Sequence, residues 1–252
     1  MADEGSWRGI AIAQWLTPIQ GIAYRIVESQ EQVATLDIVD TLAEQSLLEE
    51  LLEHSKPAMR PGTGGLHYLL MTPFRYPPLR HGSRFGRRHE PSIFYGSHCP
   101  STALAEAAYY RLVFREGMAA PPTRPVRSEH TLFGAAYATH PGLQLQRPPF
   151  DAEQAALTDP QRYTETQTLG AAMRSEGVLA FEFTSARDPA RGTNAGLFEP
   201  TAFASPGVQD QQQWLCEVDG GGVRFLSFAS HEVVDYPRDG FLVDGQLPMP
   251  AL

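Results

Sequence analysis

Three side chains that could take part in binding or catalysis lie at equal spacing in one segment of the chain: Arg84, Tyr95 and Glu106. A guanidinium keeps its positive charge and grips phosphate oxygens through two parallel hydrogen bonds. A single carboxylate can support a positive charge that develops during a reaction. This combination could bind an anionic nucleotide and support a developing positive charge.

Each of the three residues also has an ordinary structural interpretation. Arg84 belongs to an arginine-rich segment that could equally be a solvated loop, although Gly82 and Gly86 leave room for a ligand near the backbone. A tyrosine at a strand end, such as Tyr95, is typical of a core residue with its hydroxyl at the rim. Glu106 lies early in a predicted helix, where a negative charge interacts well with the helix dipole.

Ser185 adds a fourth polar group at the end of an apolar strand face. Its position is in phase with Leu179, Phe181 and Phe183, which predicts that its hydroxyl is buried. A buried hydroxyl needs a hydrogen-bond partner, which is either backbone or a ligand group. The loop that follows is rich in glycine, arginine and asparagine.

The elements that position these residues follow from local patterns. Alternating, β-branched or aromatic runs bounded by turn residues predict strands and hairpins. The predicted strands cover residues 21–28, 67–74, 92–97, 131–140, 142–146 and 177–185, and residues 214–228 form a hairpin around Asp219 to Gly222.

Helices are predicted where apolar residues recur at three- and four-residue steps. A long helix over Glu31 to His54 is expected to pack one face on the core. A second helix runs from about Ser101 to Glu116, with Ser101 or Thr102 as its N-cap and Gly117 at its end. One or two more helices are expected between Asp151 and Gly177.

Strands and helices interleave without a regular βαβ rhythm, so we expect a mixed α+β fold rather than a doubly wound sheet. The length of 252 residues fits a single domain. We place its core at about residues 21–235, with extensions at 1–20 and 236–252. The sequence leaves the oligomeric state open.

Composition narrows the classes of function. The formal net charge of −9 argues against general binding to nucleic acid or to a membrane surface, because both require a basic excess. The N-terminal apolar run is too short and interrupted for a signal peptide or a membrane span, and the cysteines Cys99 and Cys216 match no disulfide or zinc pattern. We expect a cytoplasmic protein without a metal site.

Several common catalytic motifs are absent from the sequence. There is no GxGxxG, no GxxxxGK[ST], no HExxH and no GxSxG. A nucleotide would therefore be held in another way, and metal catalysis or acyl-enzyme chemistry is disfavoured.

Four sequence blocks together resemble the RES domain family, the toxin half of bacterial RES-Xre toxin-antitoxin pairs. The blocks are GSRFG, IFYGS, PSTALAEAAYYR and TSARDP followed by TNAGLF, and the resemblance spans about residues 21–203. The family's Arg to Tyr to Glu spacing is matched without a gap. Departures are Phe85 where the family usually has tryptophan, and Gly86 and Arg87 in place of its asparagine region.

The resemblance implies roles for individual residues. Glu106 would stabilise the ribose cation, Arg84 would hold phosphates, Tyr95 would border nicotinamide and Ser185 would orient a polar group. The same resemblance suggests three further substrate-binding residues, which are Arg25 and Tyr24 of the first strand and Asn194 of the late loop.

The resemblance also implies an ADP-ribosyltransferase-like fold and an enzyme that uses NAD as substrate, with no prosthetic group. Hydrolysis or phosphorolysis of the nicotinamide bond is the activity we expect, with ADP-ribosylation of a protein as an alternative. A non-catalytic domain that only binds a nucleotide or partner is the third interpretation. An Xre-like antitoxin is the expected partner, and DNA binding would belong to that partner.

Overall fold

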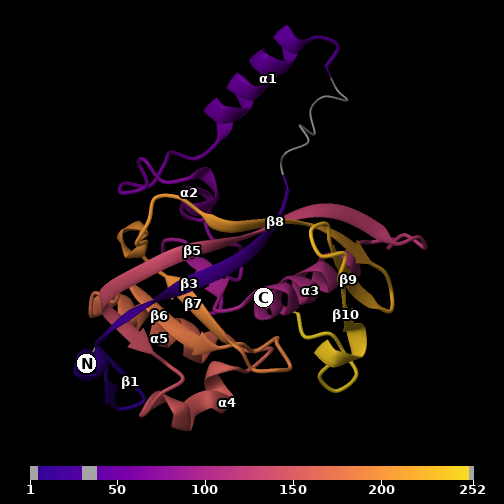
Figure 1. The fold of residues 1–252 in the computed structure, drawn as a ribbon. Helices are drawn as coiled ribbons and strands as arrows, with labels where there is room; N and C mark the ends of the chain where they lie inside the picture. The colour runs from indigo at the N-terminus through magenta and orange to yellow at the C-terminus, as the bar shows by residue number, and fades with distance from the viewer. Residues whose placement is uncertain (1–4, 30–38, 250–252) are drawn as a thin grey trace.

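The computed structural model describes residues 5–29 and 39–249, and one eight-stranded sheet organises them (Figure 1). The strand order is β10-β9-β8-β5-β3-β4-β7-β6, and β6 also pairs with β5. The strands are β3 (Thr17–Glu28), β4 (Phe94–Ser97), β5 (Val126–Gln144), β6 (Ala180–Thr184), β7 (Thr193–Leu197), β8 (Gln209–Val218), β9 (Gly222–Ser227) and β10 (Val233–Pro237). A separate hairpin pairs β1 (Ser6–Trp7) with β2 (Ile10–Ala11).

The pairings of β6 close part of the sheet into a ring. β6 runs antiparallel to β7 on one side and parallel to the end of β5 on the other. The strands β5, β3, β4, β7 and β6 therefore pair in a closed circuit, and β8, β9 and β10 extend the sheet from β5. Most neighbouring strands in the sheet are antiparallel, which confirms the predicted mixed α+β class.

The helices lie on both sides of this sheet (Figure 1). They are α1 (Leu42–Ser55), α2 (Tyr68–Arg75), α3 (Pro100–Glu116), α4 (Gln154–Leu157) and α5 (Thr164–Ser175). Four short 3-10 turns cover Ile12–Trp15, Phe150–Glu153, Pro200–Ala202 and Arg238–Phe241.

Strand alternation divides the core between the two faces of the sheet. On β6, Phe181 and Phe183 pack with the residues of α5, whereas Ala180 packs with those of α2. α3 lies on the same face as α5 but further along the sheet, over β8 and β9. The candidate site is formed by polar residues that lie between the cluster packed with α5 and the cluster packed with α3.

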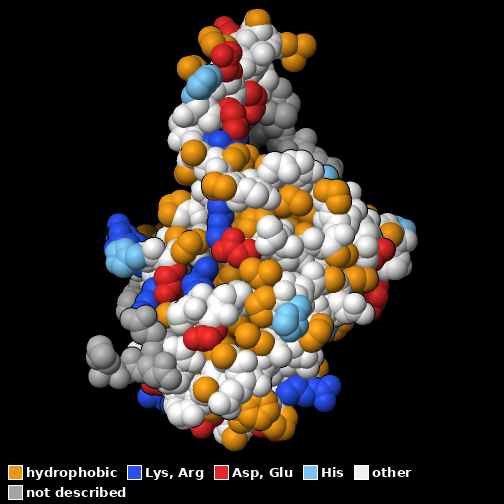
Figure 2. Space-filling model, turned by 90° about the vertical axis from the view of Figure 1, so that its left-hand side faces the viewer, with side chains coloured by type: hydrophobic (Ala, Val, Ile, Leu, Met, Phe, Trp, Pro, Cys, Tyr) orange, Lys and Arg blue, Asp and Glu red, His pale blue; other side chains and the backbone are white. Residues whose placement is uncertain are grey.

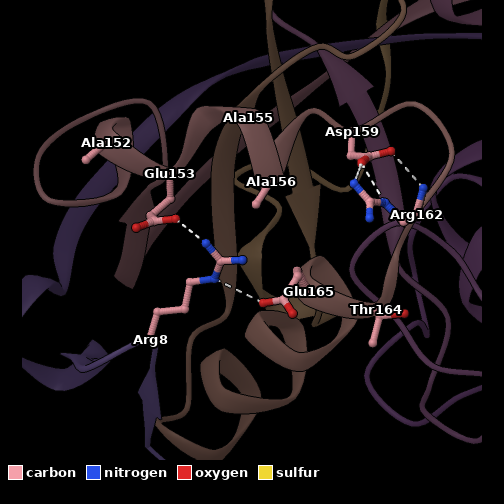
Figure 3. Close-up of a pocket in the computed structure, with 9 residues that line it drawn as sticks. All are labelled: Arg8, Ala152, Glu153, Ala155, Ala156, Asp159, Arg162, Thr164 and Glu165. Atoms are coloured by element: carbon pink, nitrogen blue, oxygen red, sulfur yellow. Dashed lines mark hydrogen bonds and ion pairs between the residues drawn. The ribbon is translucent and has the colours of Figure 1, made fainter. Parts of the chain in front are cut away.

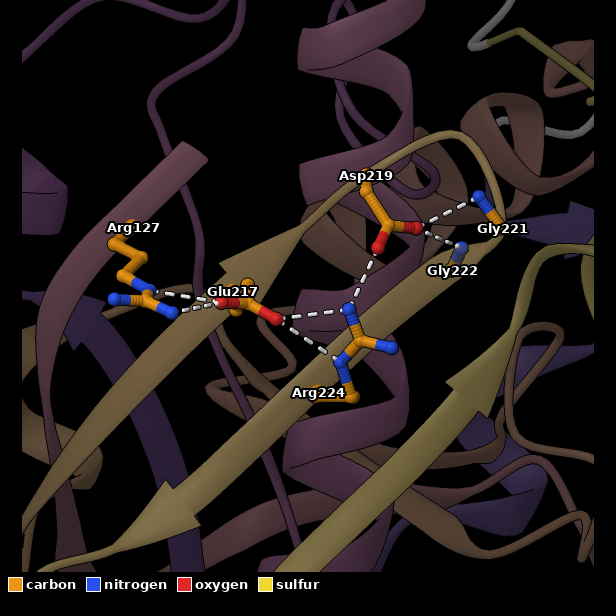
Figure 4. A network of polar contacts seen from close by, with 6 residues as sticks. All are labelled: Arg127, Glu217, Asp219, Gly221, Gly222 and Arg224. Atoms are coloured by element: carbon orange, nitrogen blue, oxygen red, sulfur yellow. Dashed lines mark hydrogen bonds and ion pairs between the residues drawn. The ribbon is translucent and has the colours of Figure 1, made fainter. Parts of the chain in front are cut away.

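Several sequence predictions agree with the structure. The first strand, the strand that carries Tyr95, the strand that precedes Ser185 and the helix that carries Glu106 are all present. The hairpin of β8 and β9 turns at Asp219, whose carboxylate accepts hydrogen bonds from the N–H groups of Gly221 and Gly222 at 2.7 and 3.2 Å. Arg224 bridges Asp219 and Glu217 across this turn (Figure 4).

The prediction of a strand at residues 67–74 is wrong, because this segment is helix α2. His67 caps the helix by accepting a hydrogen bond from the N–H of Leu69 at 3.3 Å. Leu70 and Phe74 are buried one helical turn apart. The apolar run is too short for its pattern to distinguish the periodicity of a helix from that of a strand.

The predicted long helix is only partly recovered, and its expected packing is wrong. Residues 30–38 of that prediction lie outside the described residues, and the helix begins at Leu42 after an N-cap at Thr41. None of the residues of α1 is buried. Its leucines therefore contribute nothing to the core of the described chain.

Two further boundaries differ from expectation. The strands predicted at 131–140 and 142–146 are one strand, β5, because β3 pairs with it as far as Gly142 and β6 continues the pairing from there. The N-cap of α3 is Cys99 rather than Ser101 or Thr102, with Pro100 in the first helical position. The hydroxyl of Thr102 is used elsewhere, as described below.

Residues near both ends of the described chain contribute to the packed core. Trp7 and Ile12 pack beside Phe150, and Phe241 and Leu247 pack beside α3, all nearly inaccessible to solvent. Parts of the segments expected to be extensions therefore pack against the core, while the single-domain boundaries stay a prediction.

Phe85 is the residue whose burial anchors the segment before β4. It is fully buried, with its ring 4.8 Å from the rings of both Phe181 and Phe183. We expect Phe85→Ala to lower the free energy of unfolding by about 3–5 kcal/mol through cavity formation. Phe228→Ala, at a ring that is 46% exposed, should change it by less than about 0.5 kcal/mol. Urea unfolding measures both, and equal effects would contradict this assignment.

Candidate functional site

The carboxylate of Glu106 is the centre of a polar cluster between α3 and the end of the strand ring. Its Oε1 accepts a hydrogen bond from Ser185 Oγ at 2.6 Å and another from Asn194 Nδ2 at 2.7 Å. The amide oxygen of Asn194 accepts from Ser97 Oγ at 2.7 Å, which fixes the orientation of the amide. The structure thus brings together three residues predicted from separate parts of the sequence.

Strand pairing explains why these donors meet. Ser97 on β4 and Asn194 on β7 are register partners, and β7 also pairs with β6, which ends just before Ser185. α3 leaves this end of β4 through Cys99 and carries Glu106 back over the sheet. The ends of three neighbouring strands therefore face one side chain of the helix that crosses them.

The loop after Ser185 is fixed to the start of α3. Ser185 Oγ accepts the N–H groups of Arg187 and Asp188 at 3.1 and 2.9 Å, while donating its proton to Glu106. The Asp188 carboxylate accepts from Thr102 Oγ1 at 2.7 Å. Ser185 is therefore a positioning residue that ties the loop to Glu106.

Arg84 is presented by a tight turn with several restraints. Ser83 and Gly86 pair in an isolated antiparallel β-bridge. Gly82 has a φ of 72°, a conformation that favours glycine. A Cβ at Gly82 would lie 2.2 Å from the carbonyl oxygen of Gly86. Together with the buried ring of Phe85, these restraints set the direction in which Arg84 leaves the backbone.

Tyr95 supports this same turn from β4. Its hydroxyl lies 2.9 Å from Ser83 Oγ and accepts the N–H of Phe85 at 3.1 Å. Burial raises the pKa of the Tyr95 phenol to about 12, so it is neutral at physiological pH. Its direct contacts are therefore with the turn that holds Arg84, and a contact with substrate stays a prediction.

Two guanidinium groups contact Tyr163. Arg84 stacks over the Tyr163 ring at 4.7 Å and donates to the carbonyl oxygen of Asp159 at 2.9 Å. Arg187 donates to the Tyr163 hydroxyl at 3.2 Å and stacks over the ring of Tyr109 at 3.6 Å. Arg187 is only 6% exposed.

Arg187, Tyr109 and Tyr163 were not among the predicted site residues. Tyr109 lies one helical turn after Glu106, so its side chain projects from the same face of the helix. Arg187 follows Ser185 by two residues in the TSARDP block. The spacing of Tyr109 from Glu106 and of Arg187 from Ser185 could have identified these two residues from the sequence. No motif or spacing in the sequence pointed to Tyr163.

The charges of this cluster are not neutralised by direct ion pairs. Across residues 5–29 and 39–249, no cationic side chain lies within 4.0 Å of the Glu106 carboxylate, and neither Arg84 nor Arg187 lies so close to a carboxylate. Glu106 is held by neutral donors, and the two arginines donate to carbonyl and phenol oxygens. Within the described residues, this arrangement leaves one negative and two positive groups without an ion-pair partner.

Tyr24 and Arg25 alternate on β3 and so point to opposite faces of the sheet. Tyr24 packs with the α3 cluster and donates to the Asp210 carboxylate at 3.1 Å. Arg25 lies over the Phe94 ring at 5.4 Å, with its Nη1 donating to the Tyr95 carbonyl oxygen at 2.9 Å. Burial lowers the pKa of Arg25 to about 10. No hydrogen bond or ion pair among the described residues joins either side chain to Glu106, and their role in substrate binding stays a prediction.

A separate surface pocket lies beside α4 and α5 (Figure 3). Its arginine, Arg8, is bonded to both Glu153 and Glu165, and Arg162 pairs with Asp159 at 3.0 Å. Because both arginines that line this pocket are already paired with carboxylates, the pocket suits an anionic ligand less well than the cluster around Glu106.

Two other kinds of site were sought in the described part of the chain. No group of three or more histidine, cysteine, aspartate or glutamate residues there could hold a metal ion. None of the helices there combines the length and the apolar run required to cross a bilayer.

Comparisons with known proteins identify a family. A model described as the RES domain matches residues 58–219, which is more than half of the chain. A solved structure titled as a crystal structure of the M. tuberculosis MbcT-MbcA toxin-antitoxin complex aligns with 12% sequence identity and a TM-score of 0.42. That alignment covers 90% of this chain and 89% of the other. No curated protein matches in sequence.

Ser185→Ala tests the positioning role of this hydroxyl. The change removes a donor to Glu106 and leaves the N–H groups of Arg187 and Asp188 unpaired in a buried loop. We expect the free energy of unfolding to fall by about 1–3 kcal/mol. Ser55→Ala, at an exposed serine at the end of α1, should change it by less than about 0.5 kcal/mol. Thermal or urea unfolding provides the comparison, and an unchanged Ser185→Ala protein would contradict the role.

Proposed function

The chain belongs to the RES domain family, and we propose that it cleaves the bond between nicotinamide and ribose in NAD as the toxin of a toxin-antitoxin pair. The observation that carries the chemistry is the Glu106 carboxylate, which is bound by Ser185 and Asn194 but paired with no cation among the described residues.

The chemistry requires stabilisation of a developing positive charge. When the bond from C1 of the ribose to nicotinamide breaks, the bonding electrons leave with nicotinamide, which becomes neutral. The ribose then resembles an oxocarbenium ion, and a nearby carboxylate interacts more strongly with it than with the substrate. Because the leaving group needs no proton, one carboxylate can suffice where an ordinary glycosidase uses two.

The neutral donors suit Glu106 to this task. An adjacent arginine would already satisfy much of its charge and would repel the ribose cation. Ser185 and Asn194 instead fix the position of Oε1 while leaving the carboxylate negative. Preorganised groups of this kind stabilise a transition state without having to reorient during the reaction.

Arg84 and Arg187 supply the matching positive groups for the pyrophosphate. Both guanidiniums are held by aromatic rings and carbonyl oxygens, so their positions are set before a ligand binds. Arginine is suited to this use, because it keeps its charge and matches the geometry of phosphate oxygens.

The acceptor that attacks C1 is the open part of the proposal. Water gives ADP-ribose, with its oxygen bonded to C1 and a proton released, whereas phosphate gives the corresponding ribosyl phosphate. The same carbon could be attacked by a protein side chain, so ADP-ribosylation of a target protein is the second candidate. A purely binding domain is disfavoured, because Arg84, Tyr95, Glu106 and Ser185 are all present.

The partner proposal rests on family membership. Toxins of the RES-Xre type are restrained by an antitoxin, so we propose such a partner for this chain, acting in the cytoplasm where NAD is available. Any DNA binding would belong to the antitoxin. The formal charge of −9 agrees with a protein that does not itself bind nucleic acid.

Glu106→Gln provides the direct test of mechanism. The amide keeps the size of the side chain and an oxygen for Ser185 and Asn194, but it removes the charge. We expect release of nicotinamide from NAD to fall about 10²-fold or more, with an unchanged circular dichroism spectrum. The readouts are chromatography of nicotinamide and ADP-ribose products, with and without phosphate, and the intact mass of any added protein.

The matched control for this test is Glu232→Gln, at an exposed glutamate between β9 and β10, which should keep full activity. Retained turnover in Glu106→Gln would remove this residue from the mechanism. A mass gain on an added protein, with little free ADP-ribose, would favour the second candidate. If the unmodified chain leaves NAD intact, the proposed reaction is wrong.

Arg84→Gln and Arg187→Gln test the pyrophosphate contacts. Measured by calorimetry in the inactive Glu106→Gln protein, either change should weaken NAD binding about 10- to 100-fold, because a charge-assisted hydrogen bond is lost. Binding of nicotinamide alone, which has no phosphates, should change less than about twofold. Arg124→Gln, at an exposed arginine, is the control. Equal losses for both ligands would indicate a structural role through Tyr163.

A further inference from the structure

Helix α1 presents apolar side chains that the rest of the described chain does not cover. Leu47 and Leu51 are 56% and 59% exposed, Leu52 is 38% exposed, and no residue of the helix is buried. The helix projects from the body next to α2 (Figure 1), and hydrophobic and acidic side chains lie together on its surface (Figure 2).

These leucines form one stripe. At 3.6 residues per turn, Leu47 and Leu51 are neighbours, as are Leu48 and Leu52, and the two pairs lie side by side on the helix. Leu42 is 82% exposed but lies on the opposite side of the helix. The stripe therefore has the form of a contact surface on one face.

The helix is capped at its start and linked to α2 at its end. Thr41 and Glu44 form a capping box at its start. At its end, Glu53 pairs with Arg75 of α2 at 2.7 Å and with Lys56 at 2.9 Å. An isolated helix of 14 residues is only marginally stable in water, and most helices gain stability by packing an apolar face. This helix has a cap and a link to α2, but no surface within the described residues covers its leucines.

The charge of the helix selects the kind of partner. Residues 42–55 contain four glutamates and neither lysine nor arginine, within a chain whose formal net charge is −9. Two copies of this helix would bring like charges together, which is unfavourable for self-association. A partner with basic residues around an apolar groove matches both the leucines and the glutamates.

We propose that α1 is a docking helix whose leucine stripe binds an apolar groove rimmed by lysine or arginine on a different protein. Recognition of an amphipathic helix by such a groove uses side chains at i and i+4, as this helix provides. The inference goes beyond NAD cleavage and does not depend on it, since α1 shares no contact with Glu106.

Site-specific photo-crosslinking tests this proposal in the cells that naturally produce the chain. A photoreactive amino acid replaces Leu48 in the full chain carrying Glu106→Gln, and mass spectrometry identifies the attached peptide. We expect a peptide from another protein that carries apolar residues and a net positive charge. A second copy of this chain, an acidic peptide, or no adduct would overturn the proposal.

Quantitative binding to the purified partner then distinguishes the stripe from the rest of the helix. Leu47→Ser with Leu51→Ser should weaken binding about 100-fold by calorimetry, and Glu50→Lys and added salt should also weaken it. Leu42→Ser, on the opposite side of the same helix, should leave the affinity unchanged. Similar losses for Leu42→Ser and the double variant would overturn the assignment of this face.

Discussion

The hydrogen bonds from Ser185 and Asn194 to Glu106 are the interactions on which the candidate site depends. They join a helix, a loop after β6 and a strand, at distances of 2.6 and 2.7 Å. Because both donors are neutral, they fix the carboxylate without compensating its charge. The same Ser185 hydroxyl organises the loop that delivers Arg187, so positioning of the negative group and of one positive group is coupled.

The closed strand ring makes this coupling possible. β4, β7 and β6 are neighbours through antiparallel pairing, which brings Ser97, Asn194 and Ser185 to one edge although they are distant in the chain. α3 and α5 cover the same face, and Tyr109 of α3 and Tyr163 just before α5 supply the aromatic rings beside this site. Arg84 and Arg187 are held against those rings, so the site combines rigid apolar support with groups whose charge is not neutralised.

Residue type and spacing leave the surroundings of some residues open. The structure shows that the hydroxyl of Tyr95 binds the turn that carries Arg84, while its contact with nicotinamide stays a prediction. The leucines of α1 have the spacing of a core helix, yet none is buried. In both cases the local pattern identified the element correctly and left its surroundings undetermined, because neighbours in space are not neighbours in the chain.

The sequence by itself determined the α+β class, the strand and helix that carry Tyr95 and Glu106, and the polar residues that resemble the RES family. Those features depend on periodicity, turn residues and short motifs, all of which are local. Only the tertiary structure decided that Ser185 and Asn194 bind one oxygen of Glu106, that Arg187 stacks on Tyr109, that Arg25 faces away, and that α1 is exposed. These outcomes depend on strand pairing and packing between distant segments, where geometry rather than residue type selects the partner.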